Sequence, residues 1–219
     1  KNYINSNGII SVNVCLDKFK ISEEEFFDYF NKLNKFEFTD NAQDWFFDKN
    51  NISNNKLYKL GLKLFSNSKN YLIDDFINAI NRTNQLEIMP TREKVLSYFN
   101  NCFNAEFDGE NIFIESILEN EIPEFDKKII SCFENNKILH RDEFLVIAEN
   151  KQINLRKAGF YLSLGPLVKR VKRGVYAKAN SNISHDEIIE YVEKINKNRK
   201  NIKDWGYKED GSVWFGTSL

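Results

Sequence analysis

The chain has little of what marks an extracellular, membrane or metal-binding protein. Its three cysteines, Cys15, Cys102 and Cys132, are odd in number and widely spaced, and with only two histidines they form no metal-ligand pattern. Each cysteine is most simply a small buried apolar residue. The apolar runs are too short to span a bilayer, and the start of the chain does not resemble a signal peptide. We therefore expect a cytoplasmic protein with no metal, no cofactor and no membrane contact.

Catalytic motifs are also scarce. His140, Arg141 and Asp142 imitate the start of a kinase catalytic loop, but Ile147 stands where that loop needs Asn. No glycine-rich phosphate loop accompanies them, and His140 is better explained as the end of a strand beside the cap of the next helix. Acidic pairs such as Asp74 and Asp75 sit at expected helix starts, where the helix dipole favours them. We expect no catalytic residues and no enzyme activity.

Glycine and proline are few, whereas apolar and aromatic residues are plentiful. The 219 residues include 9 Gly and 3 Pro against 19 Phe and 9 Tyr, and 42% of the chain is hydrophobic. This composition predicts an ordered, packed protein. The Asn-x-Ser/Thr matches at Asn51, Asn81 and Asn182 follow from the abundance of Asn and do not indicate glycosylation.

Charge is unevenly distributed, although the net charge is only -1. Residues 1–150 carry 17 Lys and Arg against 25 Asp and Glu, whereas residues 151–203 carry 13 against 4. The second stretch therefore presents a local positive potential that a phosphate backbone would feel at short range. A solvated basic face, or one that docks on the acidic part of the same chain, would give the same pattern.

Hydrophobic periodicity and turn residues divide the chain into three similar units, each read as helix, short strand, two helices and a two-stranded hairpin. This order predicts a mainly α protein with small antiparallel β-wings, an α+β fold of three tandem winged helix-turn-helix units. The units span residues 1–50, 55–116 and 122–180, and residues 184–219 add a helix and a hairpin. Because the first unit has only the end of a first helix and the chain begins at Lys1 without Met, we expect a fragment of a longer protein.

Capping residues place the helices of the first two units. In the first unit a remnant helix is expected at Asp17–Phe19, and Ser22 caps the helix that follows it. In the second unit Asp74 or Asp75 caps one helix and Thr91 caps another.

The third unit is the clearest. Apolar residues at helical spacing predict helices over 124–135, 141–149 and 154–163, and the last of these turns Leu155, Ala158 and Leu162 to one side. Pro166 ends that helix. A hairpin follows over 167–179, with Gly174 available for a positive φ at its turn.

Cations gather on the third helix and the hairpin of this unit. A winged helix lays its third helix in the major groove and its wing on the flanking backbone, so we expect this unit to bind double-stranded DNA. The candidate DNA-binding residues are Arg156, Lys157, Tyr161, Lys169, Arg170, Lys172 and Arg173. The alternative is a protein-interaction or scaffold module that binds a protein partner or an upstream domain, because Phe160 is also expected on the outer face.

Beyond this unit, Ser184 is expected to cap a helix over 186–196, and Trp205–Phe215 has the pattern of a hairpin around Asp210 and Gly211. Trp205 and the aromatic residues near it are more typical of packing than of a ligand cage.

The string Leu162–Tyr176 resembles the helix-to-wing junction of bacterial sigma-factor-like helix-turn-helix DNA-binding proteins. In that family a small residue and Pro precede an apolar, basic wing that contains Arg-Gly-x-Tyr, as Gly165, Pro166 and Arg173–Tyr176 do here. The passages around Trp45 and around Asp108 resemble the two winged helices that often precede the junction. The resemblance implies tandem winged helices and a DNA-binding role in bacterial transcription regulation.

Overall fold

The chain folds into a mixture of helices and small sheets. The computed structural model describes residues 2–83, 90–118 and 122–201. More than half of the described residues are helical, and the strands form three separate three-stranded antiparallel sheets, an α+β architecture. No helix within these ranges is both long and apolar enough to cross a membrane. The hairpin predicted at Trp205–Phe215 lies outside the described residues.

The first segment, residues 2–48, holds a sheet in which β3 lies between β1 and β2. Its elements are α1 (Asn2–Asn7), β1 (Ile10–Ser11), α2 (Val12–Phe19), α3 (Glu23–Leu33), β2 (Phe36–Phe38) and β3 (Trp45–Asp48). Ser22 caps α3 as predicted, because its hydroxyl accepts from the backbone N–H of Glu25 at 3.2 Å. The predicted helix remnant at Asp17–Phe19 is too short, since the helix begins at Val12 and buries Val12 and Cys15 on one face.

The second segment, residues 49–118, holds a sheet in the order β4-β6-β5. Its elements are a 3-10 helix, η1 (Lys49–Asn54), then α4 (Lys56–Asn67), β4 (Asn70–Leu72), α5 (Ile73–Thr83), α6 (Arg92–Phe103), β5 (Glu106–Phe107) and β6 (Asn111–Phe113). Thr91 takes the N-cap position of α6 as predicted, but its hydroxyl makes no capping hydrogen bond. The prediction that Asp74 or Asp75 caps α5 is wrong, because both lie inside the first turn of a helix that already begins at Ile73.

The third segment, residues 122–201, holds the sheet β7-β9-β8 and ends in a long helix. Its elements are α7 (Glu124–Ser131), β7 (Ile138–His140), α8 (Arg141–Asn150), α9 (Leu155–Leu164), β8 (Val168–Lys172), β9 (Val175–Lys178) and α10 (His185–Asn201). Ser184 caps α10 as predicted, accepting from Glu187 N–H at 3.2 Å. The first helix is shorter than predicted because tight turns at Cys132 and Phe133 redirect the chain toward β7.

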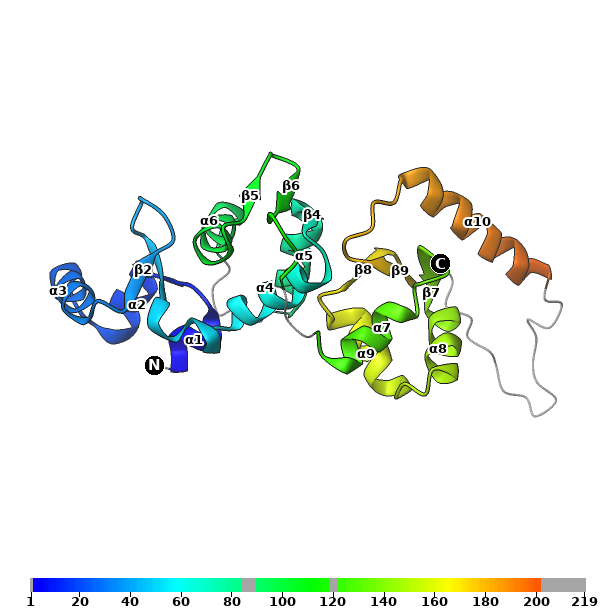
Figure 1. The fold of residues 1–219 in the computed structure, drawn as a ribbon, viewed down its shortest axis with the longest axis horizontal. Helices are drawn as coiled ribbons and strands as arrows, with labels where there is room; N and C mark the ends of the chain where they lie inside the picture. The colour runs from blue at the N-terminus through cyan, green and yellow to red at the C-terminus, as the bar shows by residue number, and fades with distance from the viewer. Residues whose placement is uncertain (1, 84–89, 119–121, 202–219) are drawn as a thin grey trace.

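One hydrophobic cluster reaches into all three segments, which follow one another in a row with α3 at one end and α10 at the other (Figure 1). The core of the second segment includes Ile9 and Phe47 from the first segment and Leu167 and Ala179 from the third. Burial of apolar side chains from both neighbours stabilises their positions against the second segment.

Candidate nucleic-acid interface

Helix α9 presents a mixed basic and apolar stripe on its outer side. The Asn154 side chain starts the helix by accepting from Lys157 N–H at 3.0 Å, and Ala158 and Leu162 are fully buried on the inner side. Arg156, Phe160 and Leu164 follow at i, i+4 and i+8, so they share one stripe. The Arg156 guanidinium lies 5.9 Å from the centre of the Phe160 ring, which is 58% exposed.

The β8–β9 hairpin carries the next group of cations. Gly174 has a φ of 74°, so the turn uses a left-handed conformation that glycine adopts without strain. A register shift between Arg170 and Lys172 bends β8 at this end. Arg170 lies opposite Tyr176 in the sheet, so both side chains are on the face that packs against the helices. Arg170 is nevertheless exposed, because β8 is an edge strand.

Arg141 connects the hairpin to α9, and sequence reasoning missed it. Its backbone N–H donates to the Gly174 carbonyl at 2.8 Å, which ties the start of α8 to the hairpin turn. Its side chain reaches α9, where a Cβ added to Gly159 would lie 3.9 Å from a guanidinium nitrogen. The sequence feature that could have indicated Arg141 is Gly159, because a glycine on α9 leaves room for the side chain of a basic residue from α8. Arg141 instead drew attention as part of a false kinase motif.

Tyr161 lies in the interior between the second and third segments. Its hydroxyl donates to Asp126, which is 3% exposed and also pairs with Lys63 at 3.0 Å. Burial, together with the charge of Asp126, raises the pKa of Tyr161 far above its usual range. Tyr161 therefore binds the carboxylate that pairs with Lys63 of the second segment, and it does not belong to the candidate interface.

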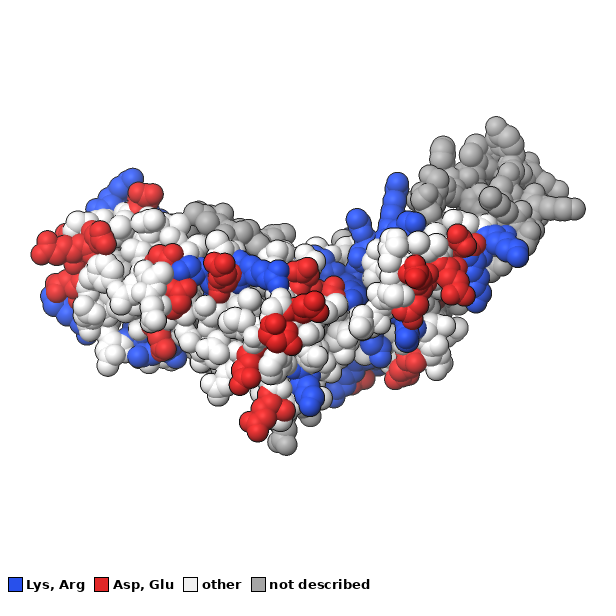
Figure 2. All heavy atoms as spheres, turned by 90° about the horizontal axis from the view of Figure 1, so that it is seen from above, with Lys and Arg blue, Asp and Glu red and all other residues white. Residues whose placement is uncertain are grey.

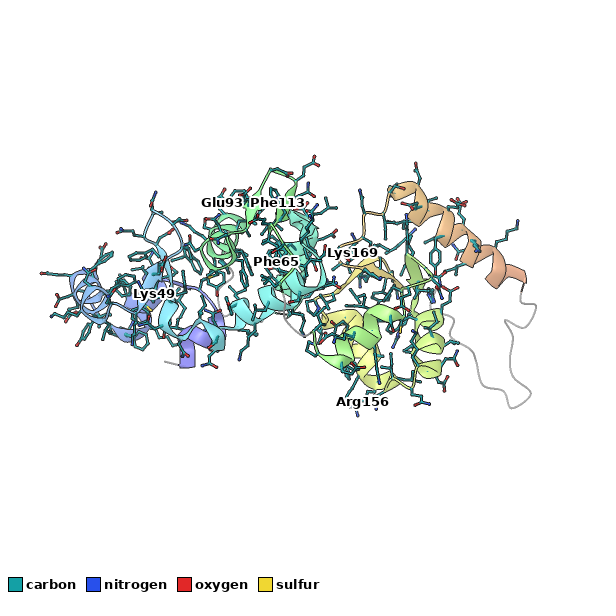
Figure 3. The ribbon with its side chains drawn as sticks, in the orientation of Figure 1. Lys49, Phe65, Glu93, Phe113, Arg156 and Lys169 are labelled. Atoms are coloured by element: carbon teal, nitrogen blue, oxygen red, sulfur yellow. The ribbon has the colours of Figure 1, made fainter. Side chains whose placement is uncertain are left out.

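Lys169 is also engaged in an intersegment contact. Its ammonium group lies 2.5 Å from the Asp75 carboxylate of α5 and donates to the Ser181 carbonyl at 2.7 Å. Only 12% of its side chain is exposed. Figure 3 shows Lys169 at the boundary between the segments, whereas Arg156 points away at the outer edge of the third. Lys169 therefore also leaves the candidate interface.

The remaining predicted cations are solvent-exposed. The candidate interface consists of six residues, the five predicted ones and the additional Arg141: Arg141, Arg156, Lys157, Arg170, Lys172 and Arg173. None of the six forms a salt bridge with a carboxylate in the described ranges. Figure 2 shows blue Lys and Arg atoms standing out over the third segment, while red atoms predominate at the α3 end. The six charges are thus available to an external anion.

The corresponding helices of the first two segments present different surfaces. On α6, Lys94 pairs with Asp40 at 2.8 Å and Asn101 donates to the Thr39 carbonyl at 3.0 Å, so the hairpin of the first segment covers this helix. Helix α3 is uncovered, but its exposed side carries Glu24 and Asp28. Of the three helices, only α9 is both open and basic.

Metal-ligating side chains do not gather anywhere in the described part of the chain. No group of three or more His, Cys, Asp and Glu residues lies close enough to hold an ion there. The three cysteines are free, and burial raises the pKa values of Cys15 and Cys132. The cysteines therefore behave as packed apolar side chains.

Comparison with known proteins adds no assignment, because no protein-family model, curated protein or solved structure matches the chain.

Proposed function

We propose that the chain binds double-stranded DNA through a winged helix formed by the third segment. The order α7, β7, α8, α9 and hairpin β8–β9 is the order of that motif, with α9 as the helix that enters the major groove. The likeness of Leu162–Tyr176 to sigma-factor-like proteins suggests a cytoplasmic bacterial transcription regulator. The first two segments would be winged-helix units that serve as the support of the third.

The observation that carries this proposal is the set of six exposed cations on α8, α9 and the β8–β9 hairpin, which make no salt bridge with any carboxylate in the described ranges. Arg156 and Lys157, near the start of α9, would face base edges. Lys172 and Arg173, at the hairpin turn, would neutralise phosphates beside the groove. Arg141 lies between the two groups, so the positive surface continues from helix to hairpin.

A protein-interaction role is the second candidate, and the apolar part of α9 favours it. Phe160 is 58% exposed and Leu164 is 52% exposed. Large apolar side chains on the reading face are more typical of a protein contact than of a bare DNA surface. DNA binding predicts a strong dependence on salt and on the hairpin cations, whereas a purely apolar contact predicts neither.

The test is a titration of labelled duplex DNA at about 50 mM and about 200 mM salt. If about five phosphates are engaged, log affinity falls with log salt at a slope of about -4 to -5, so the affinity drops about 500-fold between the two conditions. Changing Arg170, Lys172 and Arg173 to Glu should weaken binding at low salt and reduce the slope by about 3.

The matched control changes three exposed cations of the first two segments, Lys20, Lys49 and Lys59, to Glu. This variant has the same net charge as the hairpin variant and should bind nearly as the unmodified chain does. Absence of binding at low salt, or equal losses in the two variants, would refute DNA binding through the hairpin.

A further inference from the structure

A small apolar cavity opens beside α3 at the end of the chain opposite α9. Its volume is about 160 Å³, and apolar and aromatic side chains and Cys15 line it. Phe19 and Tyr29 stand at its rim with 56% and 64% of their surfaces exposed. Apolar cavities of about 150 Å³ accommodate a benzene ring. The cavity therefore fits one aromatic side chain.

The helix beside this cavity is acidic. Glu23, Glu24, Glu25 and Asp28 lie on α3 against a single cation, Lys32. Hydrogen bonds from the Ser22 backbone and hydroxyl lower the pKa of Glu25, so this carboxylate stays charged. An aromatic side chain that enters the cavity would bring its neighbours close to negative charge, and cations on those neighbours would be attracted.

Helix α9 carries the complementary pattern. Phe160 projects from it with 58% of its surface exposed, and Arg156 lies against the ring. Lys157 is exposed beside them. An exposed aromatic ring flanked by two cations matches an apolar cavity flanked by carboxylates.

The chain already contains one contact of this electrostatic type. Helix α6 of the second segment is covered by the first segment, where Lys94 lies between Asp40 and Asp44. In that contact α6 supplies the cation and the first segment supplies two carboxylates. A contact between α9 and α3 would have the same arrangement, with cations from α9 and carboxylates from α3.

From these observations we infer that copies of this chain associate head to tail, with Phe160 of one copy in the α3 cavity of the next and Arg156 and Lys157 facing its α3 carboxylates. The two surfaces lie in the first and third segments, which the second segment separates (Figure 1), so one copy cannot join them within itself. Different patches meeting in this way form a heterologous contact, which gives rings or open chains. The contact goes beyond the proposed function and stands without it, but it occupies the helix that we propose reads DNA.

The test is sedimentation velocity of the 219-residue chain without DNA, from about 5 to about 500 µM, which covers the affinities expected of a small interface. The average mass should rise with concentration at about 50 mM salt, and the association should weaken at about 500 mM salt. Phe160→Ala should weaken association at least about tenfold. Phe107→Ala is the matched control, because Phe107 is 49% exposed on β5, outside both surfaces.

A charge exchange makes the test specific. A variant with Arg156→Glu and Lys157→Glu, and a second with Glu23→Lys and Glu25→Lys, should each remain monomeric alone. Glu23 and Glu25 border the side of α3 that lines the cavity, whereas Glu24 and Asp28 lie on the opposite side of the helix. An equimolar mixture should associate, because the acidic α9 of the first variant can then contact the basic α3 of the second. The basic α9 of the second variant can likewise contact the acidic α3 of the first. A monomer at every concentration, or association that neither Phe160→Ala nor the charge changes reduce, would overturn the inference. DNA binding is measured separately, so failure of one proposal does not imply failure of the other.

Discussion

Replacing Asp126 by Ala should be among the most destabilising single changes in the contact between the second and third segments. The carboxylate is 3% exposed, pairs with Lys63 at 3.0 Å and accepts from the Tyr161 hydroxyl. Breaking a buried pair typically destabilises by about 3 to 5 kcal/mol, but Lys63 keeps 28% of its side chain in solvent, which lowers this to about 2 kcal/mol. The unsatisfied Tyr161 hydroxyl adds about 1 kcal/mol. We expect a loss of about 3 kcal/mol.

The two partners of the carboxylate also predict the result of a double-mutant cycle. Tyr161→Phe alone should destabilise by about 1 kcal/mol, because Asp126 keeps its contact with Lys63. Combined with Asp126→Ala it removes the orphaned hydroxyl and its penalty, so the double variant should lose about 2 kcal/mol. The single losses sum to about 4 kcal/mol, so the double variant should be about 2 kcal/mol more stable than that sum.

Thermal unfolding followed by circular dichroism measures these differences, and about 3 kcal/mol corresponds to a midpoint lowered by about 6 to 12 °C for a chain of this size. Glu149→Ala is the matched control, because it removes an equal charge from an exposed helical position. It should change stability by less than about 0.5 kcal/mol. If Asp126→Ala behaves like the control, or if the two single changes are simply additive, the Asp126 contact does not hold the segments together.

Three further predictions concern packing and protonation. Asn55→Ala should destabilise by about 2 to 3 kcal/mol in denaturant titrations, because the buried amide caps α4 and binds the backbone of the first segment; a loss below about 0.5 kcal/mol would contradict this. Gly61→Ala should destabilise by about 1 to 3 kcal/mol, because the new Cβ would lie 2.4 Å from a ring atom of Phe99; an unchanged melting temperature would contradict this. Burial raises the pKa of Cys102 to about 12 and that of Tyr98 further. These pKa values in the folded chain exceed the unfolded values of about 8.5 for Cys and about 10 for Tyr. The free energy of unfolding is therefore highest below about pH 8 and falls as pH rises. Each group that is ionised only in the unfolded chain lowers it by about 1.4 kcal/mol per pH unit. Cys102→Ala should flatten the fall that begins near pH 9, and a stability profile that stays level to pH 11 would contradict it.

Local sequence signals predicted the elements of the third segment well. The buried positions Ala158 and Leu162 of α9 and the glycine of the hairpin turn depend on neighbours within a few residues, although Leu155, expected on the same side, is 40% exposed. Helix boundaries were less predictable where longer-range packing decides them. Val12 extends α2 because it is buried under the first sheet, and α7 stops early because the chain must turn into β7.

The composition of the candidate interface depended on contacts that no local pattern encodes. Periodicity places Tyr161 and Lys169 on the polar side of their elements but does not identify what lies against them. In the structure Asp126 on α7 of the same segment lies against Tyr161, and Asp75 of the second segment lies against Lys169. Arg141 lies beside α9 only because β7 pairs with β9, which brings the start of α8 to the hairpin turn.

The alternation along β8 links the support of the third segment to its exposed surface. Successive residues of a strand point to opposite sides, so Lys169 reaches Asp75 of the second segment while Arg170 faces solvent. A change that rotates the third segment against α5 would therefore break the Lys169 pair and reorient the hairpin cations together. The acidic character of the second segment has a structural use in this arrangement, because its Asp75 pairs with Lys169 at the intersegment contact, while the stripe of α9 with Arg156 and Phe160 stays exposed.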